Sequence, residues 1–156
     1  MSYDLKLERI LDAPPELVFD TIVDPAFADD IFGDQVEGWT AKRFDIDLRV
    51  GGTWALEFGP RDGGGPTDTI TSVFTAIDRP RLIEYDSTMY VSEWGRSVTF
   101  TETVTFEEQD GKTLLTIVQS DIQTEADRDA FLSGVPGWLD AVQRVAERRA
   151  GEAGTR

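Results

Sequence analysis

The sequence predicts an α+β domain in which an antiparallel sheet packs against one long helix near the C-terminus. Apolar and polar residues alternate with the period of a β-strand in residues 3–11 and through much of residues 41–121. Residues 124–149 instead place their apolar side chains at helical spacing. The length of 156 residues is usual for one compact domain. We therefore expect a single domain over residues 1–150 and a frayed tail over residues 151–156.

The N-terminal part predicts one strand followed by two short helices. The strand over residues 3–11 ends at Asp12-Ala13-Pro14-Pro15. Pro15 suits the first turn of a helix, and the residues after it form an apolar stripe at helical spacing: Val18, Phe19, Ile22 and Val23. Asp24-Pro25 ends this helix, and residues 25–38 indicate a second short helix followed by a loop.

Six further strands are expected between residues 41 and 121. The first two alternate on either side of Gly51-Gly52, which predicts a tight hairpin turn. Asp47 and Arg49 are expected to hold this hairpin through an ion pair or backbone hydrogen bonds, rather than to contact a ligand. The other strands are expected at about residues 67–78, 81–89, 96–107 and 112–121, with Asp110-Gly111 as the turn between the last two.

A helix of some 25 residues is expected after Thr124, a suitable N-cap. Its apolar stripe consists of Phe131, Val135, Trp138, Val142, Val145 and Ala146. Gly134, Pro136 and Gly137 interrupt this stretch, so we expect a kink or a break there.

The composition excludes several kinds of chemistry. The chain contains no cysteine and no histidine, and therefore no thiolate or imidazole nucleophile and no zinc site with nitrogen or sulfur ligands. Asp29, Asp30 and Asp34 could hold a hard cation through oxygen ligands, but their spacing matches no EF-hand loop, and helix ends and turns explain them better. We expect no metal and no cofactor.

The charge balance bears on partners and location. Thirty acidic residues stand against 15 basic ones, and a net charge of −15 repels nucleic acid and anionic membrane surfaces. The first residues carry charges where a signal peptide would be apolar, and no run approaches the ~18 apolar residues of a membrane span. We expect a cytoplasmic protein whose acidity maintains solubility. Exposed strand edges of an open sheet are compatible with a monomer or a homodimer.

Several local motifs together resemble one superfamily. They are Asp12-Ala13-Pro14-Pro15-Glu16-Leu17-Val18-Phe19 with Asp24-Pro25, Asp47-Leu48-Arg49-Val50-Gly51-Gly52-Thr53-Trp54, Asp78-Arg79-Pro80-Arg81-Leu82, the hairpin around Asp110-Gly111, and Gly134-Val135-Pro136-Gly137-Trp138. In order and spacing they resemble START-like proteins, also called SRPBCC or helix-grip proteins, and within them the branch of the activator of heat-shock-protein-90 ATPase homologues. The resemblance covers about residues 3–149.

This resemblance implies a curved seven-stranded antiparallel sheet wrapped around the long C-terminal helix, with an apolar cavity between them. Members of the superfamily bind lipids, sterols, hormones or polyketides, and some catalyse cyclisation or hydrolysis. Fold alone does not choose among these activities.

Large aromatic side chains are the first candidates for the wall of such a cavity, because they give an apolar ligand contact area at low entropy cost. The candidates are Trp39, Trp54, Phe58, Trp94, Phe131 and Trp138. An ordinary packed core is the alternative for most of them, and a surface lid is the alternative for Trp94.

Glu102 is the most informative polar residue. It shares its strand phase with Val98, Phe100, Val104 and Phe106, which predicts that it points toward the buried face with Phe100. A buried carboxylate must be paired with arginine, hydrogen-bonded or placed in a hydrated cavity, where a raised pKa suits acid–base chemistry. A β-bulge that turns it outward is the other alternative. Gln119, in phase with Leu115 and Ile117, is expected as a second polar group beside it.

Three functions follow as hypotheses. The first is binding of a small apolar or amphipathic ligand between sheet and last helix, with Glu102 and Gln119 orienting it and the interruption at residues 134–137 acting as a gate. The second is an enzyme of the cyclase or hydrolase kind with Glu102 as general base. The third is a co-chaperone-like protein-interaction module, suggested by the resemblance.

Overall fold

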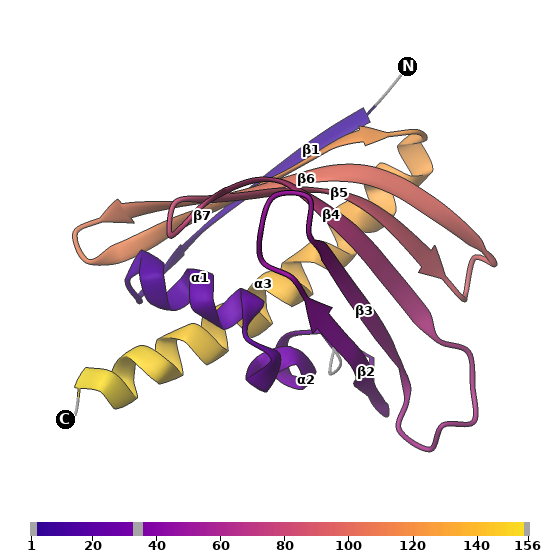
Figure 1. Cartoon of the computed structure of the whole chain (residues 1–156), viewed down its shortest axis with the longest axis horizontal. Helices are drawn as coiled ribbons and strands as arrows, with labels where there is room; N and C mark the ends of the chain where they lie inside the picture. The colour runs from indigo at the N-terminus through magenta and orange to yellow at the C-terminus, as the bar shows by residue number, and fades with distance from the viewer. Residues whose placement is uncertain (1–2, 33–35, 155–156) are drawn as a thin grey trace.

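The computed structural model describes residues 3–32 and 36–154 (Figure 1). The helices are α1 (Pro15–Val23), the 3₁₀ turn η1 (Pro25–Phe27), α2 (Ala28–Ile31) and α3 (Glu125–Gly154). The strands are β1 (Tyr3–Leu11), β2 (Trp39–Ile46), β3 (Thr53–Pro60), β4 (Asp68–Asp78), β5 (Leu82–Val91), β6 (Arg96–Gln109) and β7 (Lys112–Ile122). The α+β class and the order of elements expected from the sequence are confirmed.

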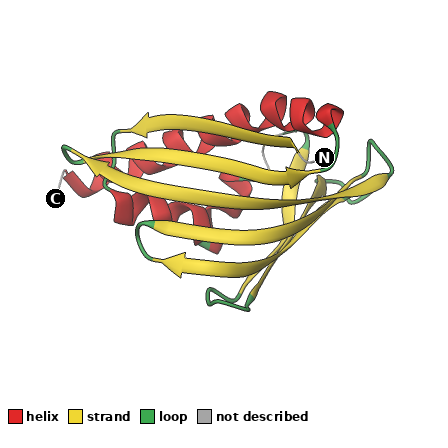
Figure 2. Ribbon diagram, turned by 90° about the horizontal axis from the view of Figure 1, so that it is seen from above, coloured by secondary structure: helices red, strands yellow, loops and turns green. Residues whose placement is uncertain are grey.

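The strands form one seven-stranded sheet in the order β1-β7-β6-β5-β4-β3-β2. Every neighbouring pair is antiparallel, and β1 pairs with β7, so the first strand forms one edge of the sheet beside the last strand. The sheet curves, and α3 runs along its concave side (Figures 1 and 2). This is the helix-grip arrangement.

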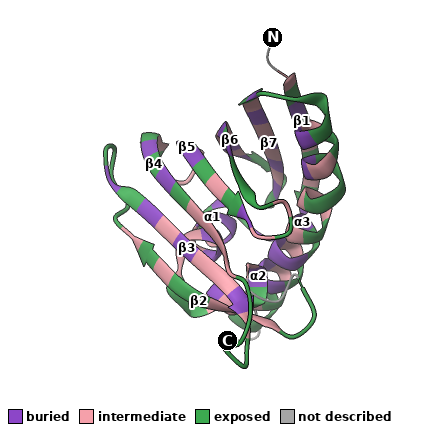
Figure 3. Cartoon of the chain, turned by 90° about the vertical axis from the view of Figure 1, so that its right-hand side faces the viewer, coloured by how far each residue is buried: buried purple, intermediate pink, exposed green. Residues whose placement is uncertain are grey.

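The main core lies where α3 meets α1 and the middle of the sheet. From α3 it takes Leu139, Val142 and Val145, and from α1 it takes Val18 and Phe19. Each is at most 2% exposed, so each removes a full apolar side chain from water, worth about 1.5–3 kcal/mol. Buried residues, purple in Figure 3, occur both on the strands of the sheet and on α3. The main core therefore lies against the C-terminal half of α3.

The start of each main helix follows the sequence prediction. Pro15 is the first residue of α1, and Glu16 lies in its first turn. Thr124 caps α3, because its hydroxyl oxygen accepts a hydrogen bond of 3.1 Å from the Asp127 N–H. The second short helix is present as η1 and α2, and the part of the expected loop at residues 33–35 lies outside the described residues.

The hairpin expected around Gly51-Gly52 is present, but its connection is longer than a tight two-residue turn. The Gly52 N–H donates to the Arg49 carbonyl at 2.8 Å and closes a turn within this connection. Strand β2 ends at Ile46 and β3 begins at Thr53, so residues 47–52 form a longer loop. The backbone of this loop also forms hydrogen bonds with strand β4. The Gly51 N–H donates to the Phe74 carbonyl at 2.8 Å, and the Phe74 N–H donates to the Gly52 carbonyl at 3.0 Å. The expected Asp47–Arg49 pair is present, with the Arg49 Nε 2.7 Å from the Asp47 carboxylate.

The last helix is not broken. It is one helix from Glu125 to Gly154 with Pro136 inside it, so it also extends four residues beyond residue 150. A proline inside a helix costs roughly 3 kcal/mol. Burial of Phe131 before it and Leu139 after it offsets this cost. Within the part of the chain that the structure describes, no helix is both long and apolar enough to cross a membrane.

Candidate functional site

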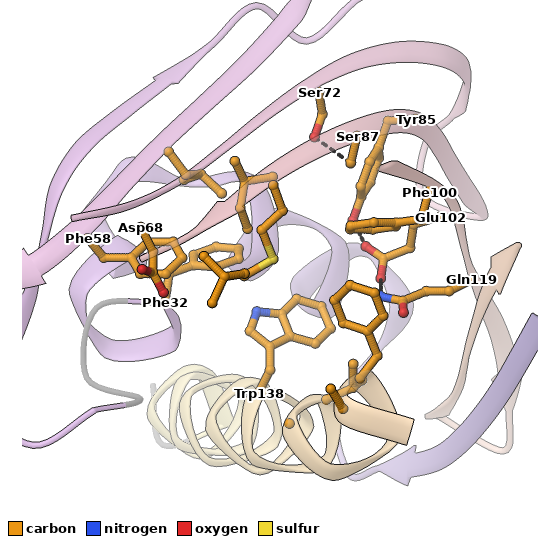
Figure 4. Close-up of a pocket in the computed structure, with 18 of the residues that line it drawn as sticks. Phe32, Phe58, Asp68, Ser72, Tyr85, Ser87, Phe100, Glu102, Gln119 and Trp138 are labelled. Carbon is orange, nitrogen blue, oxygen red and sulfur yellow. Dashed lines mark hydrogen bonds between the residues drawn. The ribbon is translucent and has the colours of Figure 1, made fainter. Parts of the chain in front are cut away.

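A cavity of about 320 Å³ lies between the sheet and the N-terminal half of α3 (Figure 4). Side chains from β3 to β7 form its ceiling, and residues of α3 between Ala130 and Trp138 form its floor. Most of the lining is apolar or aromatic, and its polar side chains are Asp68, Ser72, Ser87, Tyr85, Glu102 and Gln119. Such a lining, largely apolar with a few converging polar groups, is typical of small-molecule sites.

Three neighbouring strands bring the main polar group together. Glu102 on β6 stands directly opposite Tyr85 on β5 and Gln119 on β7. Residues opposite one another in an antiparallel sheet point to the same face, so all three side chains enter the concave side. The inward phase predicted for Glu102 and Gln119 is confirmed, and no bulge turns Glu102 outward.

Glu102 is held by hydrogen bonds and not by an arginine. The Tyr85 hydroxyl donates to its Oε2, and the Gln119 Nε2 donates to its Oε1 at 2.7 Å. Figure 4 shows the three side chains converging at one end of the cavity. Because a carboxylate only accepts, the Gln119 amide must turn its nitrogen toward Glu102, and its Oε1 is buried without a hydrogen-bond partner among the described residues.

Burial in this apolar environment raises the pKa of Glu102 above its ordinary value of 4.5, while the hydrogen bonds from Tyr85 and Gln119 act in the opposite direction. The pKa of Tyr85 is raised well above 10.0, first by burial and then by the neighbouring carboxylate. Tyr85 therefore keeps its proton and serves as a donor. Glu102 can exist as a carboxylate that accepts hydrogen bonds or as an acid that donates one.

Aromatic rings make up much of the remaining wall. Trp54 stacks on Phe74 with ring centroids 5.8 Å apart and meets Tyr85 edge-on at 5.6 Å. On the other side of Glu102, Phe100 packs against Phe131 at 5.0 Å. These contacts fix the rings without filling the space between sheet and helix.

Two further polar groups line the cavity away from Glu102. Ser72 on β4 and Ser87 on β5 share a buried hydrogen bond of 2.7 Å between their hydroxyls. The Asp68 carboxylate accepts from the Ser92 backbone N–H at 2.8 Å and from the Ser92 hydroxyl at 2.6 Å. Asp68 therefore closes the turn after β5 while it borders the cavity (Figure 4).

The structure brings seven of the eight expected ligand-binding residues around this cavity: Trp54, Phe58, Phe100, Glu102, Gln119, Phe131 and Trp138. Trp39 is the exception. It begins the edge strand β2, opposite Pro60, and is not part of the lining. Trp94 also borders the cavity, where the Arg96 guanidinium lies 5.3 Å from the centre of its ring.

Sequence reasoning missed Tyr85, although a signal was available. Ile83, Tyr85 and Ser87 alternate with charged or polar residues along β5, and all three are buried. This alternation predicts that Tyr85 points inward. Its partner could not be predicted in the same way, because the register between β5 and β6 is not a local property of either strand.

The acidic residues near α2 have structural partners. Asp29 accepts a 2.6 Å hydrogen bond from the Thr40 hydroxyl and a 2.9 Å bond from the Ala41 N–H, which lower its pKa. Asp34 lies outside the described residues. Among residues 3–32 and 36–154 there is no group of three or more acidic side chains placed to hold a metal ion.

Comparison with solved structures finds the same fold in other proteins. An uncharacterized protein from Rhizobium leguminosarum has a TM-score of 0.76 and 27% identity, over 95% of this chain and 96% of that one. A protein from Chromobacterium violaceum has a TM-score of 0.74 and 23% identity, over 93% and 98%. An AHSA1-like protein from Aeromonas hydrophila has a TM-score of 0.71 and 22% identity, over 96% and 94%.

The sequence comparisons agree with this fold. No curated protein matches the sequence significantly. The family model described as "Activator of Hsp90 ATPase homolog 1-like protein" matches residues 12–147. That range includes both short helices, six of the seven strands and most of α3. The chain belongs to the family of activator of Hsp90 ATPase homolog 1-like proteins.

Proposed function

We propose that the protein binds a small apolar or amphipathic molecule in the cavity between the sheet and α3. The observation that carries the proposal is a space of about 320 Å³ with aromatic walls and the Tyr85–Glu102–Gln119 group at one end. At about 30 Å³ per water molecule, this space has the volume of on the order of ten waters. A ligand with one or two rings is the expected size.

The polar group orients the ligand. The apolar part of the ligand fills the space beside Trp138 and Phe100, while the polar end of the ligand contacts the carboxyl group of Glu102. Gln119 and Tyr85 hold that carboxyl group in place before the ligand arrives, so little ordering is needed upon binding.

Native mass spectrometry of freshly purified protein tests this function. We expect a species heavier than the bare chain, which releases a small molecule on denaturation. Val135 is half-buried against the core at the cavity floor, so Val135→Phe places a ring in the cavity and should abolish the heavier species. Leu132→Phe is the matched control, because Leu132 lies on the same helix, is 38% exposed and does not line the cavity. Equal ligand retention by the two variants would contradict the proposal.

Acid–base catalysis on the bound molecule is a second candidate function. The raised pKa of Glu102 favours it, because an acid that titrates closer to neutral pH can both give and take a proton. Once the ligand has been recovered, Glu102→Gln distinguishes the two functions. A catalyst should lose turnover by ~10²-fold or more, whereas a binding protein should keep its affinity for uncharged ligands.

A further inference from the structure

The charged groups of the cavity all have one sign. The lining contains the carboxyl groups of Glu102 and Asp68, and among the described residues that form it there is no lysine or arginine. Asp68 has two donors from Ser92, whereas Glu102 has two neutral donors and no cation. A carboxylate that is largely removed from water and has no cation beside it is in an unfavourable environment, which is why the pKa of Glu102 is raised.

Glu102 also keeps unused acceptor capacity. Each oxygen of a carboxylate can accept about two hydrogen bonds, and each Glu102 oxygen receives one from the protein. Its side chain is half-buried and lines the cavity, so the remaining capacity is available to a ligand there. Aromatic rings, which attract cations, line the same cavity: Phe100 precedes Glu102 by two residues on β6, and Trp138 enters from α3 (Figure 4).

We propose that the cavity selects a small organic cation, in which a protonated amine contacts Glu102 and an aromatic or apolar body fills the space toward Trp138. This inference rests on the proposed ligand-binding function and specifies the chemistry of the ligand. The ammonium group loses its water on entry, and the carboxylate and the ring faces compensate for that loss. A ligand with a carboxylate or phosphate at the same end would instead meet a like charge.

The contact requires an ionised Glu102. The titratable neighbours that face it are Tyr85 on β5 and, farther along the cavity wall, Asp68 on β4. Gln119 on β7 does not titrate, and neither does any of the α3 residues that line the cavity: Ala130, Phe131, Gly134, Val135 and Trp138. Affinity for an amine should therefore rise with pH as Glu102 loses its proton, while affinity for an uncharged analogue should change much less.

Three probes of matched size test the proposal: 2-phenylethylamine, 2-phenylethanol and phenylacetate. Their binding is followed by calorimetry at neutral pH and moderate salt. We expect the amine to bind roughly tenfold more tightly than the alcohol, because the ammonium group and the Glu102 carboxylate carry opposite charges, whereas the hydroxyl donates as a neutral group. Phenylacetate should bind most weakly.

Two variants distinguish the effect of the Glu102 carboxylate on amine binding from the effect of the overall negative charge of the protein. Glu102→Gln should lower the affinity for the amine by about tenfold and change that for the alcohol little. Asp86→Asn is the matched control, because Asp86 is exposed and accepts a hydrogen bond from Thr101 outside the lining of this cavity. If Glu102→Gln does not fold, the pH dependence of the wild-type protein replaces it: amine affinity should fall as the pH decreases toward 4.5, and alcohol affinity should fall much less.

The outcomes distinguish the two proposals. If the alcohol binds as tightly as the amine, or if Asp86→Asn weakens amine binding as much as Glu102→Gln does, selection for cations is wrong while ligand binding stands. If none of the three probes binds, the proposed function fails as well.

Discussion

The hydrogen bond from Tyr85 to Glu102 gives the sharpest test of the polar group. Tyr85→Phe removes one hydroxyl and keeps the ring. The centroid of this ring lies 5.6 Å from that of Trp54 and 5.9 Å from that of Phe74. The substitution therefore removes a single hydrogen-bond donor to the half-buried carboxylate of Glu102. Hydrogen bonds to charged groups contribute about 1.5–3 kcal/mol and neutral ones about 0.5–1.5 kcal/mol. We expect the free energy of unfolding to fall by about 2 kcal/mol at neutral pH.

The cost should depend on pH in a defined direction. Burial raises the pKa of Glu102 in the folded state, so the folded protein holds this proton more firmly and loses stability as the pH rises above 4.5. The Tyr85 hydroxyl opposes that rise in pKa, and its removal raises the pKa further. The difference between variant and wild type should therefore shrink to about 1 kcal/mol when Glu102 is protonated.

Urea unfolding followed by circular dichroism at acidic and neutral pH measures both quantities. Tyr90→Phe is the matched control: Tyr90 lies on the same strand, is 39% exposed and does not line the cavity, so its substitution should change stability little. A Tyr85→Phe cost that is absent at neutral pH, or that grows toward acidic pH, would refute the account of this group.

Three further substitutions test other parts of the structure by the same unfolding measurement. Gly134→Ala should raise the free energy of unfolding by about 0.5–1 kcal/mol, because a Cβ there meets nothing within 4 Å and alanine favours a helix; a loss of stability would contradict this. Gly52→Ala should lower it by about 1–3 kcal/mol, because its Cβ would lie 2.1 Å from the Asp47 carbonyl oxygen. Asp127→Asn should lower the free energy of unfolding by about 1 kcal/mol at neutral pH. The exposed Arg96 guanidinium lies 2.6 Å from the buried Asp127 carboxylate and lowers the pKa of Asp127. Since the pKa of Asp127 is lowered, the pair stabilises the fold above pH 3.8 and the effect should vanish as the pH falls through that lowered pKa; a constant effect would count against it.

The sequence alone predicts the features that depend on local periodicity. Alternation along β6 is enough to point Glu102 inward, and the hydroxyl of Thr124 is enough to begin α3 where it begins. The alternation of apolar and polar residues and the N-cap of a helix each involve only a few consecutive residues, so both can be recognised without knowing which residues are neighbours in space.

Features that depend on distant neighbours could not be predicted in this way. Tyr85 and Glu102 meet because β5 and β6 pair in one particular register. The Gly51-Gly52 segment is held by β4, which no local pattern reveals. Pro136 is tolerated within α3 because the apolar residues on both sides of it are buried, and their burial outweighs the local cost of a proline.

The most direct test of the central claim is a crystal structure of the protein grown with 2-phenylethanol, which carries no charge and so tests the cavity independently of cation selection. If the cavity binds such ligands, the phenyl ring lies between Trp138 and Phe100 and the hydroxyl lies within hydrogen-bonding distance of the Glu102 carboxyl group. A structure in which protein side chains fill this space, with the probe absent from it, would contradict the account.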